Sequence, residues 1–176
     1  AATWQRIEQE QPLMSRAGQV GDELGSRLIA ARLIRDIMRL CFLHEKQYAP
    51  YPKWFGTAFG HLACAPELLP RLEGVSHAET WQSREAALNE ALIFLAHRQN
   101  ELTLTAPVKI HIDSFFSRPF KVLKSDFVNA LLLEIQDDEV KRIAKKPLIG
   151  NIDLLSDNTD LRANPQWQPD LLRLYT

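Results

Sequence analysis

The segment after residue 47 gathers the side chains best suited to binding a ligand. Tyr48, Tyr51, Trp54 and Phe55 surround Lys53, and two prolines lie among them. Aromatic faces can hold a nucleic-acid base, and an ammonium group beside them can hold a phosphate. The same composition is also typical of a rigid corner between two helices, in which the rings fill the core. The prolines restrict the backbone in both cases, so a ligand site and a structural corner both stay open.

A second candidate pair is Arg39 and His44, which have four residues between them. This spacing is similar to the Arg-x4–6-His signature of HEPN-type ribonucleases, whose fold is helical. On a regular helix, however, five steps of about 100° place the two side chains about 140° apart. We therefore expect His44 to be a structural histidine at a helix end, with ribonuclease chemistry as the alternative.

Acidic residues cluster near the C-terminus, where Asp153, Asp157 and Asp160 lie close to Asn151 and Asn158. Hard cations bind such oxygen ligands. The alternating order of an EF-hand loop is missing, however, and Asx turns and helix caps account for short polar side chains in such a segment. We therefore expect no metal site here.

A Gly-Ser step at residues 25–26 invites comparison with polymerase-β-type nucleotidyltransferases. In these enzymes such a step is followed, about ten residues later, by two acids on a strand that bind two metal ions. Here Asp36 is followed by Met38 where the second acid should be, and the segment has helical periodicity. The sequence also has no P-loop, GxGxxG, GxSxG or zinc-ligand spacing. We predict no catalytic residue and no nucleotidyl transfer by this chain alone.

Helical periodicity dominates the chain, most strongly over residues 22–48, before Pro50. Its predicted inward residues are Leu24, Leu28, Ala31, Leu33, Ile37, Met38, Leu40 and Cys41. Asp36 is expected to pair with Arg32 one turn away. Further helices are predicted at residues 4–11, 53–63, 67–73 (closed by Gly74), 76–102 (with a Ser76–Glu79 capping box), 125–135, 138–146 and 169–175. With one short extended segment at residues 108–112, the expected fold is all-α or nearly so, a bundle or array of about 6–8 helices.

The bulk composition is that of one folded domain spanning residues 1–176, with 45% hydrophobic and 24% charged residues. A net charge of −1, from 21 basic and 22 acidic residues, gives no global field that favours nucleic acid or an anionic membrane. There is no apolar run of about 18 residues and no signal-peptide pattern. We expect a cytoplasmic protein with no membrane partner, in which Cys41 and Cys64 are buried, reduced thiols.

Three segments are similar to motifs of a bacterial family of domains of unknown function, DUF4037. They are residues 41–59, which include Tyr-Ala-Pro-Tyr-Pro-Lys-Trp, residues 116–120 (Phe-Ser-Arg-Pro-Phe) and residues 149–160. In family members this helical region follows a nucleotidyltransferase-like domain. The resemblance implies that the chain is the C-terminal part of a longer protein, with that N-terminal domain as its partner. The start at Ala1, without an initiator methionine, agrees with this expectation.

The same resemblance implies a function and a set of site residues. The chain would be an accessory domain that helps to bind nucleotide or acceptor substrate, without catalysis of its own. Mg²⁺ and a nucleotide would belong to the full-length protein, and this chain would carry no cofactor. The alternatives are a HEPN-like ribonuclease and a structural or oligomerising module whose aromatic residues all lie in the core. The implied substrate-binding residues are Tyr48, Tyr51, Lys53, Trp54, Arg118 and Asp157.

Overall fold

The structure is a computed structural model that describes residues 1–151, 161 and 165–175. It is predominantly helical, as predicted. Its four long helices are α1 (Ala2–Gln19), α2 (Glu23–His44), α4 (Ala65–His77) and α5 (Trp81–Glu101). The shorter elements are α3 (Pro52–Phe59), β1 (His111–Ser114), β2 (Lys121–Lys124), α6 (Phe127–Leu133), α7 (Asp138–Ala144), the 3-10 helix η1 (Pro165–Trp167) and α10 (Gln168–Leu172).

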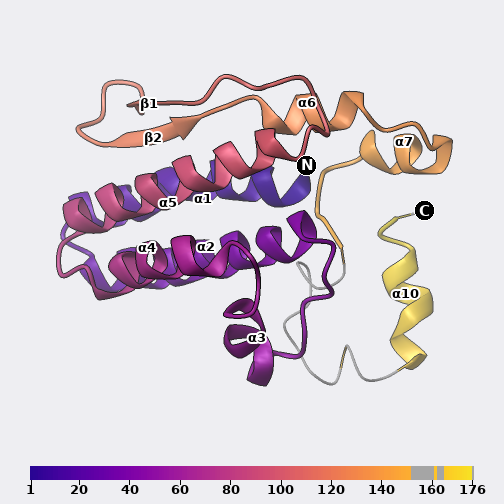
Figure 1. Cartoon of the computed structure of the whole chain (residues 1–176), viewed down its shortest axis with the longest axis horizontal. Coiled ribbons are helices and arrows are strands. Elements are labelled where there is room, and N and C mark those ends of the chain that lie inside the picture. Colours follow the sequence, from indigo (N-terminus) through magenta and orange to yellow (C-terminus); the bar gives the residue numbers. More distant parts are fainter. Residues whose placement is uncertain (152–160, 162–164, 176) are drawn as a thin grey trace.

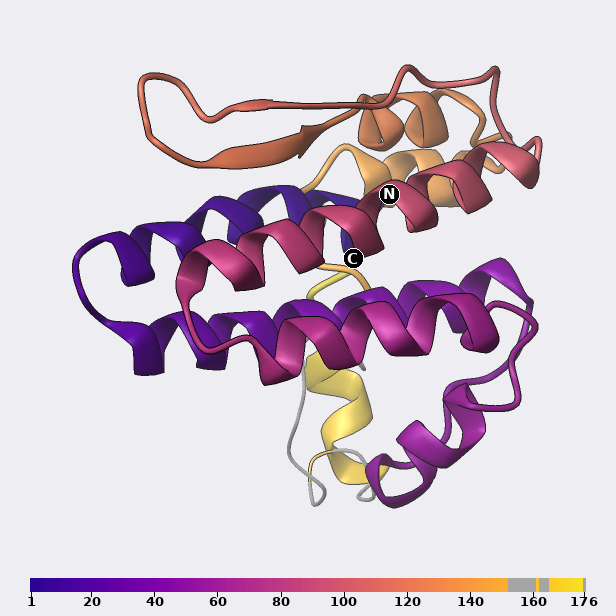
Figure 2. The same cartoon turned by 60° about the vertical axis from the view of Figure 1, so that its left-hand side comes forward.

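The four long helices form a bundle in which α1 packs on α2 and α5, and α4 packs on α5 and α2 (Figures 1 and 2). Two ion pairs set α1 antiparallel to α2. Arg32 Nη2 lies 2.6 Å from Glu10 Oε1, and Arg6 Nε lies 2.9 Å from Asp36 Oδ2. The predicted local pairing of Asp36 with Arg32 is therefore wrong. Both residues form their ion pairs with α1, because the Asp36 carboxylate points inward.

The helix α1 is longer than the predicted 4–11 segment because it continues through Pro12 and Gly18. Gly18 lies at the contact with α5, where an added Cβ would come 2.1 Å from Cβ of Trp81. This glycine therefore permits a close approach of two helices, although in the sequence it looks like a helix end. The expected stop at Gly74 is also wrong, since α4 runs on to His77.

The buried face of α2 is only partly the predicted one. Leu33, Ile37 and Leu40 lie in the core, as expected. Leu24, Leu28 and Ala31, by contrast, point to solvent. Their predicted inward orientation is wrong because the helix is apolar on more than one side, and the packing of α1 and α5 selects which side is covered.

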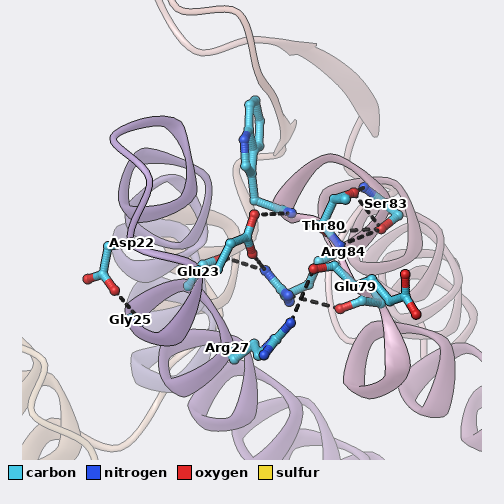
Figure 3. A network of polar contacts seen from close by, with 11 residues as sticks. Asp22, Glu23, Gly25, Arg27, Glu79, Thr80, Ser83 and Arg84 are labelled. Carbon is cyan, nitrogen blue, oxygen red and sulfur yellow. Dashed lines mark hydrogen bonds and ion pairs between the residues drawn. The ribbon is translucent and has the colours of Figure 1, made fainter.

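A buried arginine joins the first turns of α2 and α5 (Figure 3). The side chain of Arg84 is fully buried and donates to Glu23 Oε2 at 3.0 Å, to Ser26 Oγ at 2.7 Å and to the carbonyl of Ala78 at 2.9 Å. Glu23 Oε1 in turn accepts from the backbone N–H of Trp81 at 2.9 Å. This network fixes the register of the two helices at one end of the bundle.

The start of α5 differs from the prediction. The predicted capping box at Ser76 and Glu79 is wrong, because α4 extends to His77. The capping box is formed instead by Thr80 and Ser83, four residues further on, and α5 begins at Trp81. Helical spacing within residues 76–102 predicts one inward face with Trp81, Leu88, Leu92 and Leu95. The three leucines are buried, as predicted, whereas Trp81 is half-buried.

A β-hairpin lies along α1 and α5 (Figures 1 and 2). Its strands are antiparallel, with Ile112 opposite Leu123. Side chains from the two helices satisfy the outer edge of β2: Lys121 N–H donates to Glu85 Oε1 at 2.9 Å, and Leu123 N–H donates to Gln11 Oε1 at 3.1 Å. The sequence indicated an extended segment at residues 108–112, three residues before β1, and did not reveal β2.

The short helix α6 packs against α1 of the bundle. Phe127 is fully buried and stacks on Trp4, with ring centroids 4.7 Å apart, and Trp4 Nε1 donates to Gln99 Oε1 at 2.8 Å. The helices α6, α7 and α10 lie within the predicted segments or within about two residues of them. Cys41 and Cys64 are both buried and free, as expected. No helix in the described parts of the chain is both long and apolar enough to cross a membrane.

Candidate functional site

The aromatic segment, residues 48–55, follows the end of α2. This helix ends at His44 and not at Tyr48 as predicted. Lys46 adopts a left-handed conformation with φ of 54°. Gln47 N–H donates to the carbonyl of Phe42 at 2.8 Å, and Lys46 N–H donates to that of Leu43 at 3.1 Å. These two bonds are the Schellman pattern of a helix C-terminus. The helix therefore stops four residues earlier than Pro50 would require, and the aromatic segment leaves it in a defined direction.

Three of the four aromatic rings of this segment point to solvent. Tyr48 is 85% exposed, Tyr51 60% and Trp54 56%. Lys53 lies on the same exposed surface, with Nζ 5.1 Å from the centroid of the Trp54 ring. Only Phe55 behaves as a structural corner residue, because it packs on Phe42 of α2 with ring centroids 5.4 Å apart. This exposure argues against a purely structural corner.

A cleft of about 340 Å³ opens beside Tyr48, between the start of α1 and the end of α2. Its lining combines the Arg39 guanidinium and amide side chains with apolar groups. The lining residues are Ala1, Ala2, Thr3, Arg39, Phe42, Leu43, Gln47, Tyr48, Ala49, Gly150 and Asn151. The volume is at the small end of the range for small-molecule sites.

A second hollow of about 360 Å³ lies on the other side of Tyr48, towards α3. Gln47 and Tyr48 line both hollows, whereas Glu45 and His61 line only the second. The first hollow therefore carries a cation, Arg39, and the second carries a carboxylate. This arrangement suits an anion in the first cleft, with a flat group against the Tyr48 ring.

Arg39 and His44 do not converge in this chain. Arg39 lines the cleft, whereas His44 lies on the side of α2 that faces Cys64 and Arg98. His44 Nε2 is 3.0 Å from Gln99 Oε1. Burial lowers the pKa of His44, which favours the neutral ring. These contacts agree with a structural histidine and give no support within one chain to the HEPN-like alternative.

The acids singled out in the sequence are the C-terminal cluster and Asp36. Asp153, Asp157 and Asp160 lie outside the described residues, and among the residues described no three His, Cys, Asp or Glu side chains converge. Asp36, the acid that follows the Gly-Ser step, is fully buried on a helix beside Arg6. Burial, the largest effect, raises the pKa of Asp36, and the Arg6 charge opposes it.

The structure separates Arg118 from the aromatic segment. Arg118 lies in the loop of the β-hairpin, whose Lys121 is bonded to Glu85 near the start of α5. That end of the bundle also holds the start of α2, whereas Tyr48 follows the end of α2. A helix of 22 residues is about 33 Å long. Arg118 therefore does not belong to the same site as Tyr48, Tyr51, Lys53 and Trp54.

Comparison with known proteins gives one family. Residues 1–55 match the DUF4037 family, a domain of unknown function. This match confirms the resemblance for α1, α2 and the start of α3. The DUF4037 match includes the four clustered candidates and Arg39, but neither Arg118 nor Asp157. No curated protein and no solved structure matches the chain.

Sequence reasoning missed three features of the site. It considered Arg39 only as a partner of His44 and Asn151 only beside the acidic cluster, and it did not select Gln47. The position of Arg39 at the cleft depends on the start of α1 and on residues 150–151 coming together at the end of α2. The sequence gives no signal of this contact, because it joins segments about 100 residues apart. Gln47 could have been found, since it directly precedes the aromatic segment.

Proposed function

We propose that this chain is the accessory helical domain of a nucleotidyltransferase-like protein and binds nucleotide or acceptor substrate in the cleft beside Tyr48. The observation that supports the proposal best is the exposure of Tyr48, Tyr51 and Trp54 next to an open cleft that contains a guanidinium group. Large aromatic rings exposed together are uncommon on a surface without a binding role.

The chemistry of the cleft favours a planar, anionic ligand. The ring of Tyr48 offers a stacking surface for a base, and such stacking contributes about 1–3 kcal/mol per base. Arg39 supplies a guanidinium group to the lining of the cleft, and such a group attracts a phosphate or carboxylate. Lys53, beside Trp54, supplies a second cation on the same surface. A nucleoside phosphate combines both features, which supports the nucleotide as ligand.

The backbone of this segment is restricted before any ligand arrives. Pro50 and Pro52 limit the conformations of residues 49–52, and the helix end at Lys46 is fixed by two hydrogen bonds. Phe55 anchors α3 on Phe42. Little conformational entropy is therefore lost when a ligand binds, which favours affinity.

Titration of this chain with ATP and GTP, each with Mg²⁺, tests the proposal by calorimetry and by quenching of tryptophan fluorescence, to which the exposed Trp54 contributes. We expect binding in the range of about 10 µM to 1 mM. Tyr48→Ala should weaken it at least about fivefold. Lys53→Ala should weaken it about threefold or more, with a smaller loss at high salt.

Matched controls lie at the far end of the bundle. Phe116→Ala removes an equally exposed ring and Lys121→Ala an exposed lysine of the same β-hairpin, and neither should change affinity. Inorganic triphosphate should bind to the wild type but should not distinguish Tyr48→Ala from it. Absence of nucleotide binding up to about 5 mM, or equal affinities of Tyr48→Ala and the wild type, would contradict the proposal and favour a structural module.

A further inference from the structure

An aliphatic stripe lies on the outer face of the α1–α2 hairpin, at the other end of α2 from the cleft. Leu13 is 42% exposed, Val20 81%, Leu24 68% and Leu28 61%. Leu24 and Leu28 share one face of α2 because they are four residues apart. We call these four residues the hairpin stripe. It includes two of the leucines that helical periodicity predicted to lie inside.

The four side chains form one patch. The ion pairs Arg32–Glu10 and Arg6–Asp36 fix the pairing of the antiparallel helices. Continued toward the turn, this pairing places Leu13 beside Leu28, and Ala17 beside Leu24. All four side chains are exposed in the described part of the chain. Together they expose on the order of 400 Å² of apolar surface. Patches of about 300–600 Å² are often functional.

We propose that the hairpin stripe is the interface of a homodimer, in which two α1–α2 hairpins pack face to face in antiparallel orientation. Such packing joins two helical hairpins into a four-helix arrangement with closed two-fold symmetry. A two-fold axis that crosses α1 next to Ala17 places Leu13 opposite Val20 of the partner subunit. On α2 the same axis places Leu24 opposite Leu28 of the partner subunit, so that all four side chains become covered.

A second copy fits this surface because the surface is self-complementary. The antiparallel orientation brings the turn at Asp22 over the Arg32 end of the other hairpin. Asp22 uses Oδ1 to accept from Gly25 N–H, and Arg32 uses Nη2 to bind Glu10, so that each keeps further polar atoms for the contact.

The oligomeric state of this chain tests the interface. Sedimentation equilibrium of the wild type at about 5–500 µM should show a monomer–dimer equilibrium. The double variant Leu24→Asp/Leu28→Asp should weaken dimerisation at least about 30-fold and should keep the helical circular dichroism, because both residues are exposed in the monomer. Leu133→Asp, at an exposed leucine of α6, should have no effect. A monomeric wild type throughout this range, or a dimer that survives in the double variant, would overturn the proposal.

A cysteine next to the axis tests the orientation. Ala17→Cys should form a disulfide between two copies when a mild disulfide oxidant such as glutathione disulfide is added. Two thiols then lose their protons and two electrons, and the oxidant is reduced to thiols. Leu133→Cys should not form this dimer, and the native cysteines are buried. A dimer that forms no disulfide through Ala17→Cys would refute the antiparallel arrangement. Since the stripe is remote from the cleft, nucleotide titration of Leu24→Asp/Leu28→Asp should match that of the wild type.

Discussion

Replacement of Arg84 by alanine gives the sharpest test of what holds the bundle together. The guanidinium group is fully buried; it makes two hydrogen bonds across the α2–α5 contact and a third to the carbonyl of Ala78, which follows α4. The variant leaves the Ser26 hydroxyl and the Ala78 carbonyl without this donor, at about 1–3 kcal/mol for each buried group. Glu23 adds little, because it is partly exposed and still accepts from Trp81 N–H. With the lost packing of the side chain, we expect a loss of about 3–5 kcal/mol.

Urea unfolding followed by circular dichroism measures this loss. A domain of this size is stable by about 5–15 kcal/mol, so Arg84→Ala should unfold at much lower urea or be only marginally folded. Arg84→Met keeps most of the packing and should lie between Arg84→Ala and the wild type, which keeps the test informative if alanine is not tolerated. Arg98→Ala is the matched control. Arg98 is partly exposed in its ion pairs with Glu45 and Glu101, and its loss should cost less than about 1 kcal/mol. Equal effects of Arg84→Ala and Arg98→Ala would refute the reasoning.

Two further predictions concern packing and pH. Gly18→Ala should destabilise the fold by about 2–3 kcal/mol in the same urea experiment, because its Cβ would lie 2.1 Å from Cβ of Trp81, whereas Gly56→Ala, with open space around it, should not. Because the pKa of His44 is lower in the folded chain than in the unfolded one, the unfolded state takes up the proton first as pH falls below about 6.5. The melting temperature of the wild type should therefore drop between pH 7 and pH 5 more than that of His44→Gln, and parallel pH profiles would contradict this.

Features that depend on local sequence were predicted well. The existence of the long helices, the inward residues Leu88, Leu92 and Leu95 of α5 and the last short helix follow from spacing and from turn residues. Helix ends were predicted less well. Two serine or threonine residues stood near the start of α5, and choosing Thr80 over Ser76 required knowing that α4 continues past Gly74. Pro50 correctly excluded a longer α2. The helix actually ends at His44, and Lys46, a non-glycine residue, adopts the left-handed conformation that closes it.

Features that depend on distant partners could not be predicted. Ser26 and Asp36 are buried polar residues on α2; Ser26 accepts a hydrogen bond from Arg84, and Asp36 forms an ion pair with Arg6, so that both partners lie on other helices. Because the sequence shows no sign of these partners, Asp36 was paired locally with Arg32, and Leu24 and Leu28 were predicted to point inward. The candidate site divides in the same way. Its aromatic segment is contiguous and was found, whereas the cleft with Arg39 forms only when the start of α1 meets residues 150–151.

The attachment of β2 through side chains gives the β-hairpin two independent sets of bonds. Along β2 the amides of Lys121 and Leu123 depend on Glu85 and Gln11, and the intervening Val122 pairs with Asp113 of β1. Separation of the hairpin from the helices would break the bonds of Lys121 and Leu123 and uncover the buried side chains of Val122 and Leu123, but it would leave the backbone bonds between the strands intact. Hydrogen exchange at neighbouring amides of β2 therefore reports two separate openings. The amides of Lys121 and Leu123 report separation of the hairpin from the bundle, and that of Val122 reports separation of the two strands.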